Sequence, residues 1–217
     1  MPKLIIFDLD GTLLDTIEDL ANSVNYALQQ YNLPTHEVDA YRFFVGNGVD
    51  KLLERALPAD KQNADMLSML KMEFLKHYYS HTDDSTKPYP GLANLLSTLY
   101  AKGYQLAIAS NKVHPATVEL AARFFPDVKF TAVFGQREGY PAKPNAGILE
   151  EIISLANVAK SEVLYVGDSG VDALTASNAQ VPFVGVLWGF RPRVELEAFG
   201  AELFVANAHE LLELIRN

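Results

Sequence analysis

The chain of 217 residues contains no cysteine, which excludes disulfides, thiolate metal sites and cysteine nucleophiles. Long apolar runs are also missing. The longest one near the start, Leu4–Phe7, is interrupted by Asp8 and is too short for the hydrophobic part of a signal peptide. A membrane helix would need about 20 apolar residues. We therefore expect a cytoplasmic protein with no membrane partner.

Positive charge is scarce: 18 Lys and Arg stand against 27 Asp and Glu, giving a net charge of −9. Nucleic-acid binding needs a basic face, so nucleic acid is not an expected partner. The glycines form no dinucleotide fingerprint, and the five histidines lack the spacing of metal ligands. With 49% hydrophobic residues, the composition is that of a globular protein. We expect a small-molecule ligand and a monomer or a homodimer.

Short apolar runs alternate with amphipathic helical patterns along the chain. The runs cover residues 4–7, 106–109, 163–166 and 183–187. Uninterrupted apolar strands separated by helices are typical of a parallel sheet that is covered on both faces. The sequence therefore predicts an α/β fold with a doubly wound, Rossmann-like core.

About 100 residues separate the first two runs, far more than one crossover helix needs. Most of this stretch has helical periodicity, and Thr16 with Asp19 predicts a capping box at the start of its first helix. The polar segment 83–88 is typical of a linker. We predict a helical domain at 17–87, inserted into an α/β core made of 1–16 and 88–217.

Polar side chains follow three of the predicted strands. Asp8 and Asp10 follow the first, Ser110 the second and Asp168 the third. Ligands of α/β sheets bind at the carboxyl ends of the strands, so these groups should meet at one edge. Asp8 and Asp10 share one face of an extended chain, and Gly11 lets the backbone turn closely around a ligand. Two carboxylates this close repel each other, so a cation is expected between them. Because all their ligand atoms are oxygens, Mg²⁺ is favoured, and Asp168 would complete the site.

These motifs together resemble the haloacid dehalogenase superfamily over essentially the whole chain. They are Asp-Leu-Asp-Gly-Thr at 8–12, Ser110, Lys143-Pro144, and Gly-Asp at 167–168 followed by Asp172. The helical insertion resembles the helical cap of that family. Phe-Val-Gly-Asn-Gly at 44–48, Tyr-Pro-Gly at 89–91 and Trp-Gly-Phe at 188–190 are similar to phosphoglycolate phosphatases.

The resemblance implies a role for each motif residue. Asp8 would attack phosphorus and form an aspartyl-phosphate, while Asp10 would act as general acid and base and give its backbone carbonyl to the metal. Ser110 would bind a phosphate oxygen, and Lys143 would supply positive charge to the phosphate and to Asp8. Asp172 would order the Mg²⁺ site that Asp8, Asp10 and Asp168 form.

Substrate recognition is expected from both parts of the chain. The candidates for binding the substrate are Gly11, Thr12, Asn111, Arg42, Asn47 and Gly48. In this hypothesis the loop with Asn47 and Gly48 closes over the site and selects the substrate, and Arg42 pairs with a substrate carboxylate.

Lys112, two residues beyond Ser110, is an alternative to Lys143 as the main phosphate cation. The family usually continues Lys-Pro with Asp and another Pro, whereas this chain has Asn145-Ala146. The departure weakens the local match but leaves Lys143 in place.

The leading functional hypothesis is Mg²⁺-dependent hydrolysis of small phosphate monoesters, with phosphoglycolate as the candidate ester. A phosphosugar mutase similar to beta-phosphoglucomutase would share the aspartyl-phosphate and stays an alternative. A dehalogenase needs neither Mg²⁺ nor a second acid, so Asp10, Asp168 and Asp172 disfavour it. A catalytically inactive binding protein is the alternative from another class.

Overall fold

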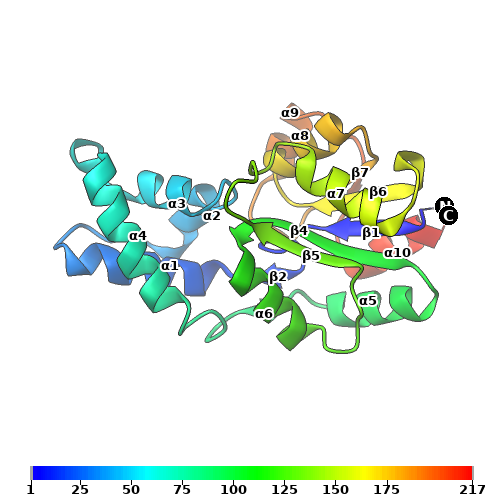
Figure 1. The fold of residues 1–217 in the computed structure, drawn as a ribbon, viewed down its shortest axis with the longest axis horizontal. Helices are drawn as coiled ribbons and strands as arrows, with labels where there is room; N and C mark the ends of the chain where they lie inside the picture. The colour runs from blue at the N-terminus through cyan, green and yellow to red at the C-terminus, as the bar shows by residue number, and fades with distance from the viewer. Residues whose placement is uncertain (1, 217) are drawn as a thin grey trace.

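A six-stranded sheet forms the centre of the protein, which the computed structural model describes over residues 2–216 (Figure 1). Its strand order is β5-β4-β1-β6-β7-β8, and every neighbouring pair is parallel. The strands are β1 (Leu4–Phe7), β4 (Gln105–Val113), β5 (Ala132–Gln136), β6 (Val163–Gly167), β7 (Phe183–Val186) and β8 (Phe204–Val205). The predicted α/β fold is confirmed.

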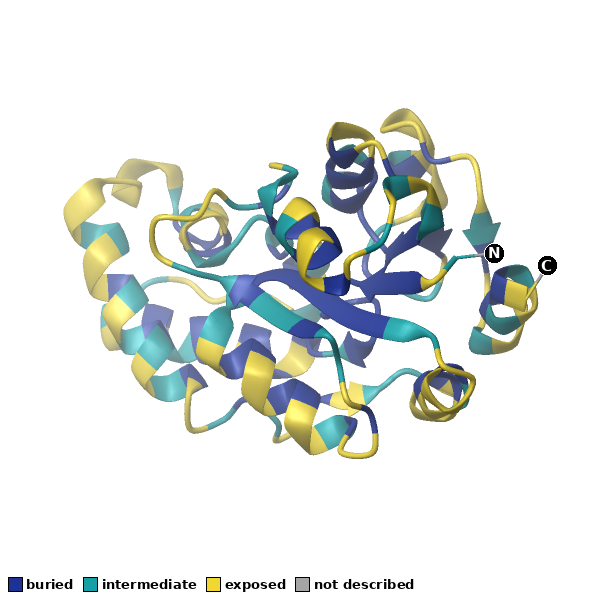
Figure 2. Cartoon of the chain, turned by 45° about the vertical axis from the view of Figure 1, so that its right-hand side comes forward, coloured by how far each residue is buried: buried dark blue, intermediate teal, exposed yellow. Residues whose placement is uncertain are grey.

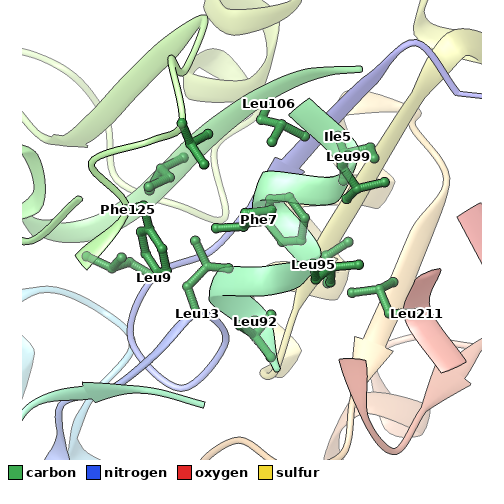
Figure 3. Close-up of a cluster of buried hydrophobic side chains, with 14 of the residues drawn as sticks. Ile5, Phe7, Leu9, Leu13, Leu92, Leu95, Leu99, Leu106, Phe125 and Leu211 are labelled. Carbon is green, nitrogen blue, oxygen red and sulfur yellow. The ribbon is translucent and has the colours of Figure 1, made fainter. Parts of the chain in front are cut away.

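Helices cover both faces of the sheet because its strands are apolar on both sides. On β1, Ile5 and Phe7 enter a cluster with α5 (Leu92–Ala101), α6 (His114–Phe124) and α10 (Ala208–Arg216), part of which Figure 3 shows. Leu4 and Ile6 point the other way, toward α7 (Gly147–Ala156) and α8 (Gly170–Ala179). A third small cluster joins α8 to α9 (Arg193–Ala198). Figure 2 shows the central strands mostly buried and the helices exposed on their outer sides.

Four helices lie between the two short strands β2 (Leu14–Asp15) and β3 (Lys87–Pro88), which pair antiparallel. We call them the helical insertion: α1 (Ile17–Gln30), α2 (Tyr41–Phe44), α3 (Val49–Ala56) and α4 (Ala64–Tyr78). They lie at one end of the sheet (Figure 1) and have their own hydrophobic cluster, which Ala116 and Phe190 of the rest of the chain join. This arrangement supports the predicted inserted domain at 17–87, and we keep that division as a proposal.

Short 3₁₀ turns complete the fold at Val38–Ala40, Ala59–Lys61 and Lys160–Glu162. Among residues 2–216, no helix combines the length and the apolar character needed to span a membrane.

The predicted capping box at the start of α1 is wrong. Thr16 makes no side-chain capping bond, and its hydroxyl donates instead to Asp10 Oδ1 at 2.7 Å. The Asp19 carboxylate accepts the N–H groups of Ser85 and Thr86 at 2.9 and 2.8 Å, and the Thr86 hydroxyl at 2.6 Å. Partners from distant parts of the chain thus replace the local cap. Asp19 links the start of α1 to the segment that leads into β3.

Candidate active site

Three buried carboxylates meet at the carboxyl ends of the central strands. Asp8 follows β1 and its N–H donates to the Val166 carbonyl at 2.9 Å, while Asp168 follows β6 directly. Asp172 lies in the first turn of α8. One carboxylate oxygen of each of these three residues lies within 4.8 Å of the others. Parallel strands bring their ends to one edge, so residues distant in sequence share this site.

Two glycines make room for the Asp168 carboxylate. Gly11 has φ +88°, and a Cβ there would lie 2.3 Å from Asp168 Oδ2. A Cβ on Gly189 would lie 2.3 Å from the Asp168 Cβ. Asp168 is oriented by the Thr12 hydroxyl, which donates to Oδ1 at 3.2 Å, and by the Phe190 N–H, which donates to Oδ2 at 2.7 Å. Thr12, a predicted substrate ligand, therefore contacts Asp168 in this structure.

Lys143 lies at the centre of a buried polar network. Its ammonium nitrogen lies within hydrogen-bond distance of four acceptors for its three N–H groups: Asp8 Oδ1 at 2.8 Å, Asp172 Oδ1 at 2.7 Å, and the Ala109 carbonyl and the Tyr165 hydroxyl at 3.0 Å each. The Tyr165 hydroxyl in turn donates to Asp172 Oδ1 at 2.7 Å. The sequence prediction did not include Tyr165, although it is the one hydroxyl within the apolar run 163–166.

Lys112 is the second buried lysine of the site. Its ammonium donates to Asp10 Oδ1 at 2.8 Å, the same oxygen that accepts the Thr16 hydroxyl. It also lies 4.9 Å from the ring centre of Tyr78. The two lysines therefore divide the pair of aspartates: Lys143 contacts Asp8 and Lys112 contacts Asp10.

Burial and mutual repulsion shift the pKa values of the carboxyl groups. Burial raises the pKa of Asp8 to about 7, with Lys143 opposing the shift and Asp172 adding to it. Burial and the charges of Asp172 and Asp8 also hold the pKa of Asp168 well above its ordinary value. Burial acts on Asp172 in the same direction, but the charge of Lys143 and the hydrogen bonds from Lys143, Ser169 and Tyr165 together outweigh it and leave the pKa of Asp172 lowered.

The site has the charge and the donor atoms that suit a divalent cation. Asp8, Asp10, Asp168 and Asp172 face two ammonium groups, which leaves two negative charges when all are ionised. The donors are carboxylate oxygens, which favour a hard ion such as Mg²⁺. Asp8 and Asp168, both predicted ligands, lie together in the cluster. The third predicted ligand is the backbone carbonyl of Asp10, and the carboxylate of Asp10 is paired with Lys112.

A cavity of about 40 Å³ lies between the strand ends and the helical insertion. That is room for roughly three water-sized groups. Its strand-end wall includes Asp8, Asp10, Ser110, Asn111, Lys112 and Lys143. Its insertion wall includes Leu20, Val45, Gly48, Leu52, Phe74 and Tyr78. The predicted catalytic residues thus share one cavity.

Only one of the three substrate ligands predicted in the insertion lines the cavity. Gly48 lines the cavity, whereas Arg42 and Asn47 do not. The Arg42 guanidinium pairs with the exposed Asp39 at 3.3 Å, and the Asn47 amide oxygen accepts from Arg55 at 2.8 Å.

Hydrogen bonds join the loop around Gly46 to the sheet side of the protein. The Asn111 amide donates to the Gly46 carbonyl at 2.9 Å and to the Lys143 carbonyl at 3.0 Å. Arg191, in the loop after β7, donates to the Val45 carbonyl at 2.9 Å. Asn111, a predicted substrate ligand, therefore lines the cavity, and its amide group also links the insertion to the loop of Lys143.

Comparison with known proteins agrees with this fold and site. The haloacid dehalogenase-like hydrolase family model matches residues 5–186, so the chain belongs to that family. The phosphoglycolate phosphatase of Mesorhizobium japonicum is 36% identical over 193 residues, covering 88% of this chain and 85% of the relative. That of Caulobacter vibrioides is 34% identical over 212 residues, covering 97% and 88%.

Solved structures lead to the same class. A predicted phosphoglycolate phosphatase from Haemophilus somnus has a TM-score of 0.91 and 28% identity, and the match covers 99% of this chain and 98% of that one. The predicted enzyme class, a phosphatase, is confirmed.

Proposed function

We propose that this protein hydrolyses small phosphate monoesters with Mg²⁺ through an aspartyl-phosphate on Asp8, and that 2-phosphoglycolate is its substrate. The observation that carries the proposal is the pairing of Asp8 with Lys143 at 2.8 Å, beside Asp10, on the wall of one small cavity. The names of the relatives support the choice of ester.

In the first step, Asp8 attacks phosphorus while the bond from phosphorus to the ester oxygen breaks. The ionised carboxylate of Asp8 needs no base to act as a nucleophile. Lys143 holds Asp8 through Oδ1 and leaves Oδ2 for the attack. Asp10 donates its proton to the departing alkoxide, which leaves as the alcohol.

In the second step, Asp10 takes a proton from water as the water oxygen attacks phosphorus. The bond between phosphorus and Asp8 breaks, which releases inorganic phosphate and restores the carboxylate. Thr16 and Lys112 position Asp10 for both proton transfers, since both donate to its Oδ1.

The Mg²⁺ ion, held by Asp8 and Asp168, would supply positive charge that offsets the repulsion between Asp8 and the phosphate. Thr12 and the Phe190 N–H fix Asp168 for this role. Asp172 acts through Lys143, which it contacts at 2.7 Å.

Ser110 and Gly11 complete the phosphate side of the site in this proposal. Ser110 lines the cavity, and its oxygen accepts the Lys112 N–H at 3.2 Å, so the hydroxyl proton is available to a phosphate oxygen. We place the protein in the cytoplasm, as a monomer or a homodimer, with a small phosphate ester as its partner.

The test is phosphate release from a panel of phosphate monoesters, with Mg²⁺ and with a chelator. Asp8→Asn should lower the rate by roughly a thousandfold or more, because the nucleophile is lost. Asp127→Asn, at an exposed position, is the matched control and should keep the wild-type rate. Chelation should stop release from every ester.

Substantial turnover by Asp8→Asn would refute the assigned nucleophile. Isomerisation of a hexose phosphate without net phosphate release would identify a mutase. A flat profile over the panel would reject phosphoglycolate as the specific substrate and leave a phosphatase of broad range.

A further inference from the structure

Two polar groups on the cavity wall have unused hydrogen-bonding capacity. Tyr78, the last residue of α4, is 1% exposed, and its hydroxyl has no hydrogen-bond partner among residues 2–216. The Lys112 ammonium donates to Asp10 Oδ1 at 2.8 Å and lies beside Tyr78, 4.9 Å from the centre of its ring. An ammonium carries three N–H donors, so the bond to Asp10 does not use all of them.

Within the described part of the chain, the side chains around the Tyr78 hydroxyl offer it no hydrogen-bond acceptor. The insertion wall around Tyr78 is apolar and includes Leu20, Leu52 and Phe74. A buried hydroxyl without a hydrogen-bond partner costs free energy, and the apolar side chains around Tyr78 cannot supply such a partner. A ligand that enters the cavity can supply the missing acceptor.

The chemistry of the pair favours an anionic acceptor. Lys112 contributes a positive charge, and Tyr78 can donate its hydroxyl proton to the same group. They come from opposite walls, since Lys112 lies on β4 and Tyr78 on α4, and the ammonium is 4.9 Å from the tyrosine ring centre. A planar group with two acceptor oxygens, such as a carboxylate, suits a donor on each side.

We propose that Lys112 and Tyr78 bind a carboxylate at the end of the substrate opposite the phosphate and thereby determine its selection. This inference rests on the proposed phosphatase function and deepens it. Arg42, the carboxylate ligand predicted from the sequence, pairs with Asp39 away from this wall.

Lys112 also contacts Asp10, so loss of its charge could act through the proton transfer alone. The two effects differ in their dependence on the substrate. A change at Asp10 slows every ester alike, whereas loss of a carboxylate ligand slows only esters that carry the carboxylate. The ratio of two substrates therefore separates selection from catalysis.

The experiment compares kcat and KM for 2-phosphoglycolate and for ethyl phosphate, which has two carbons and no carboxylate. Wild type, Tyr78→Phe and Lys112→Met are measured with Mg²⁺. Hydrogen bonds to charged groups are worth roughly tenfold to a hundredfold in binding. In both variants the ratio of kcat/KM for 2-phosphoglycolate over ethyl phosphate should fall by about tenfold or more, mainly through KM.

Tyr79→Phe is the matched control, because this neighbouring tyrosine is 45% exposed and should keep the wild-type ratio. An equal fall on both esters would overturn the proposal and assign both residues to positioning of Asp10. A wild type that hydrolyses ethyl phosphate as well as 2-phosphoglycolate would also overturn it, while the proposed hydrolysis would stand.

A binding measurement decides the inference even without turnover. Calorimetry would compare 2-phosphoglycolate binding to Asp8→Asn with binding to the same variant that also carries Tyr78→Phe. About tenfold weaker binding in the second protein supports the proposal, and equal affinity overturns it. Absence of hydrolysis of both esters by the wild type would count against the proposed function alone.

Discussion

The two walls of the cavity differ in how completely their polar groups are hydrogen-bonded. On the strand-end wall, Lys143 has four partners, and the neighbouring Asp168, outside the cavity lining, is held by a hydroxyl and a backbone N–H. On the insertion wall, the Tyr78 hydroxyl has no partner among the described residues. The protein itself holds Lys143 and Asp168 in place, whereas Lys112 and Tyr78 keep donors for a ligand. This difference fits the proposal that the chemistry takes place around Asp8 and Lys143 and that Lys112 and Tyr78, one from each wall, select the substrate.

The largest effect on stability should come from Lys143→Met. The change leaves Asp8 and Asp172 buried without their common counter-charge, so the free energy of unfolding should fall by about 3–5 kcal/mol. Urea unfolding measures it. Lys160→Met is the control, because Lys160 forms an exposed pair with Glu150 at 3.4 Å. This change should lower the free energy of unfolding by less than about 1 kcal/mol. Equal stability of the two variants would mean that the buried polar network around Lys143 contributes little to folding.

A smaller effect should appear in the pH dependence of the metal-free protein. Asp8 has a pKa of about 7 in the folded state against 3.8 ordinarily, so the folded protein keeps a proton that the unfolded chain loses. The free energy of unfolding should therefore fall as the pH rises from about 4 to 7, by at most about 1.4 kcal/mol per pH unit from this group.

Chemical unfolding in a chelator at several pH values checks the slope. Asp8→Asn should make it less steep, because this group no longer titrates while Asp168, whose pKa is also raised, still does, and Asp127→Asn should keep the wild-type slope. A slope that is the same in wild type and Asp8→Asn would contradict the raised pKa of Asp8.

The smallest effect should follow from Arg191→Met, which weakens the contact between the two walls. Arg191 donates to the carbonyls of Phe43 and Val45 at 3.2 and 2.9 Å. Without it the insertion should close less firmly, so KM should rise a few-fold, by about twofold to tenfold, with less change in kcat. The exposed Arg193, paired with Glu197, supplies the control Arg193→Met. A fall in kcat at constant KM would show that closure of the insertion is not what Arg191 supports.

The central strands could be predicted because they are continuous apolar runs. The predicted runs 4–7, 106–109, 163–166 and 183–187 correspond to β1, β4, β6 and β7. The prediction missed β5 and β8. β5 is an edge strand that is only partly buried and contains Gly135, and β8 has two residues, so neither has a continuous apolar pattern.

Part of the candidate site could be predicted for the same reason. Parallel strands end at one edge, so Asp8 and Asp168 had to come together. Tyr78 lies in the stretch for which the sequence predicts only helical periodicity, and such spacing says which side of α4 is buried and not what lies opposite the hydroxyl. The catalytic and ligand roles of these residues stay predictions.

The sequence by itself determined the alternation of strands and helices, the long helical insertion and the acidic strand ends. These features depend on local periodicity and on which side chains avoid water. Only the tertiary structure decided the other partners: Thr16 with Asp10 instead of a helix cap, Lys112 with Asp10, and Lys143 with Asp172 and Tyr165 as well as Asp8. Such choices depend on distances between atoms from distant segments, which no local pattern contains.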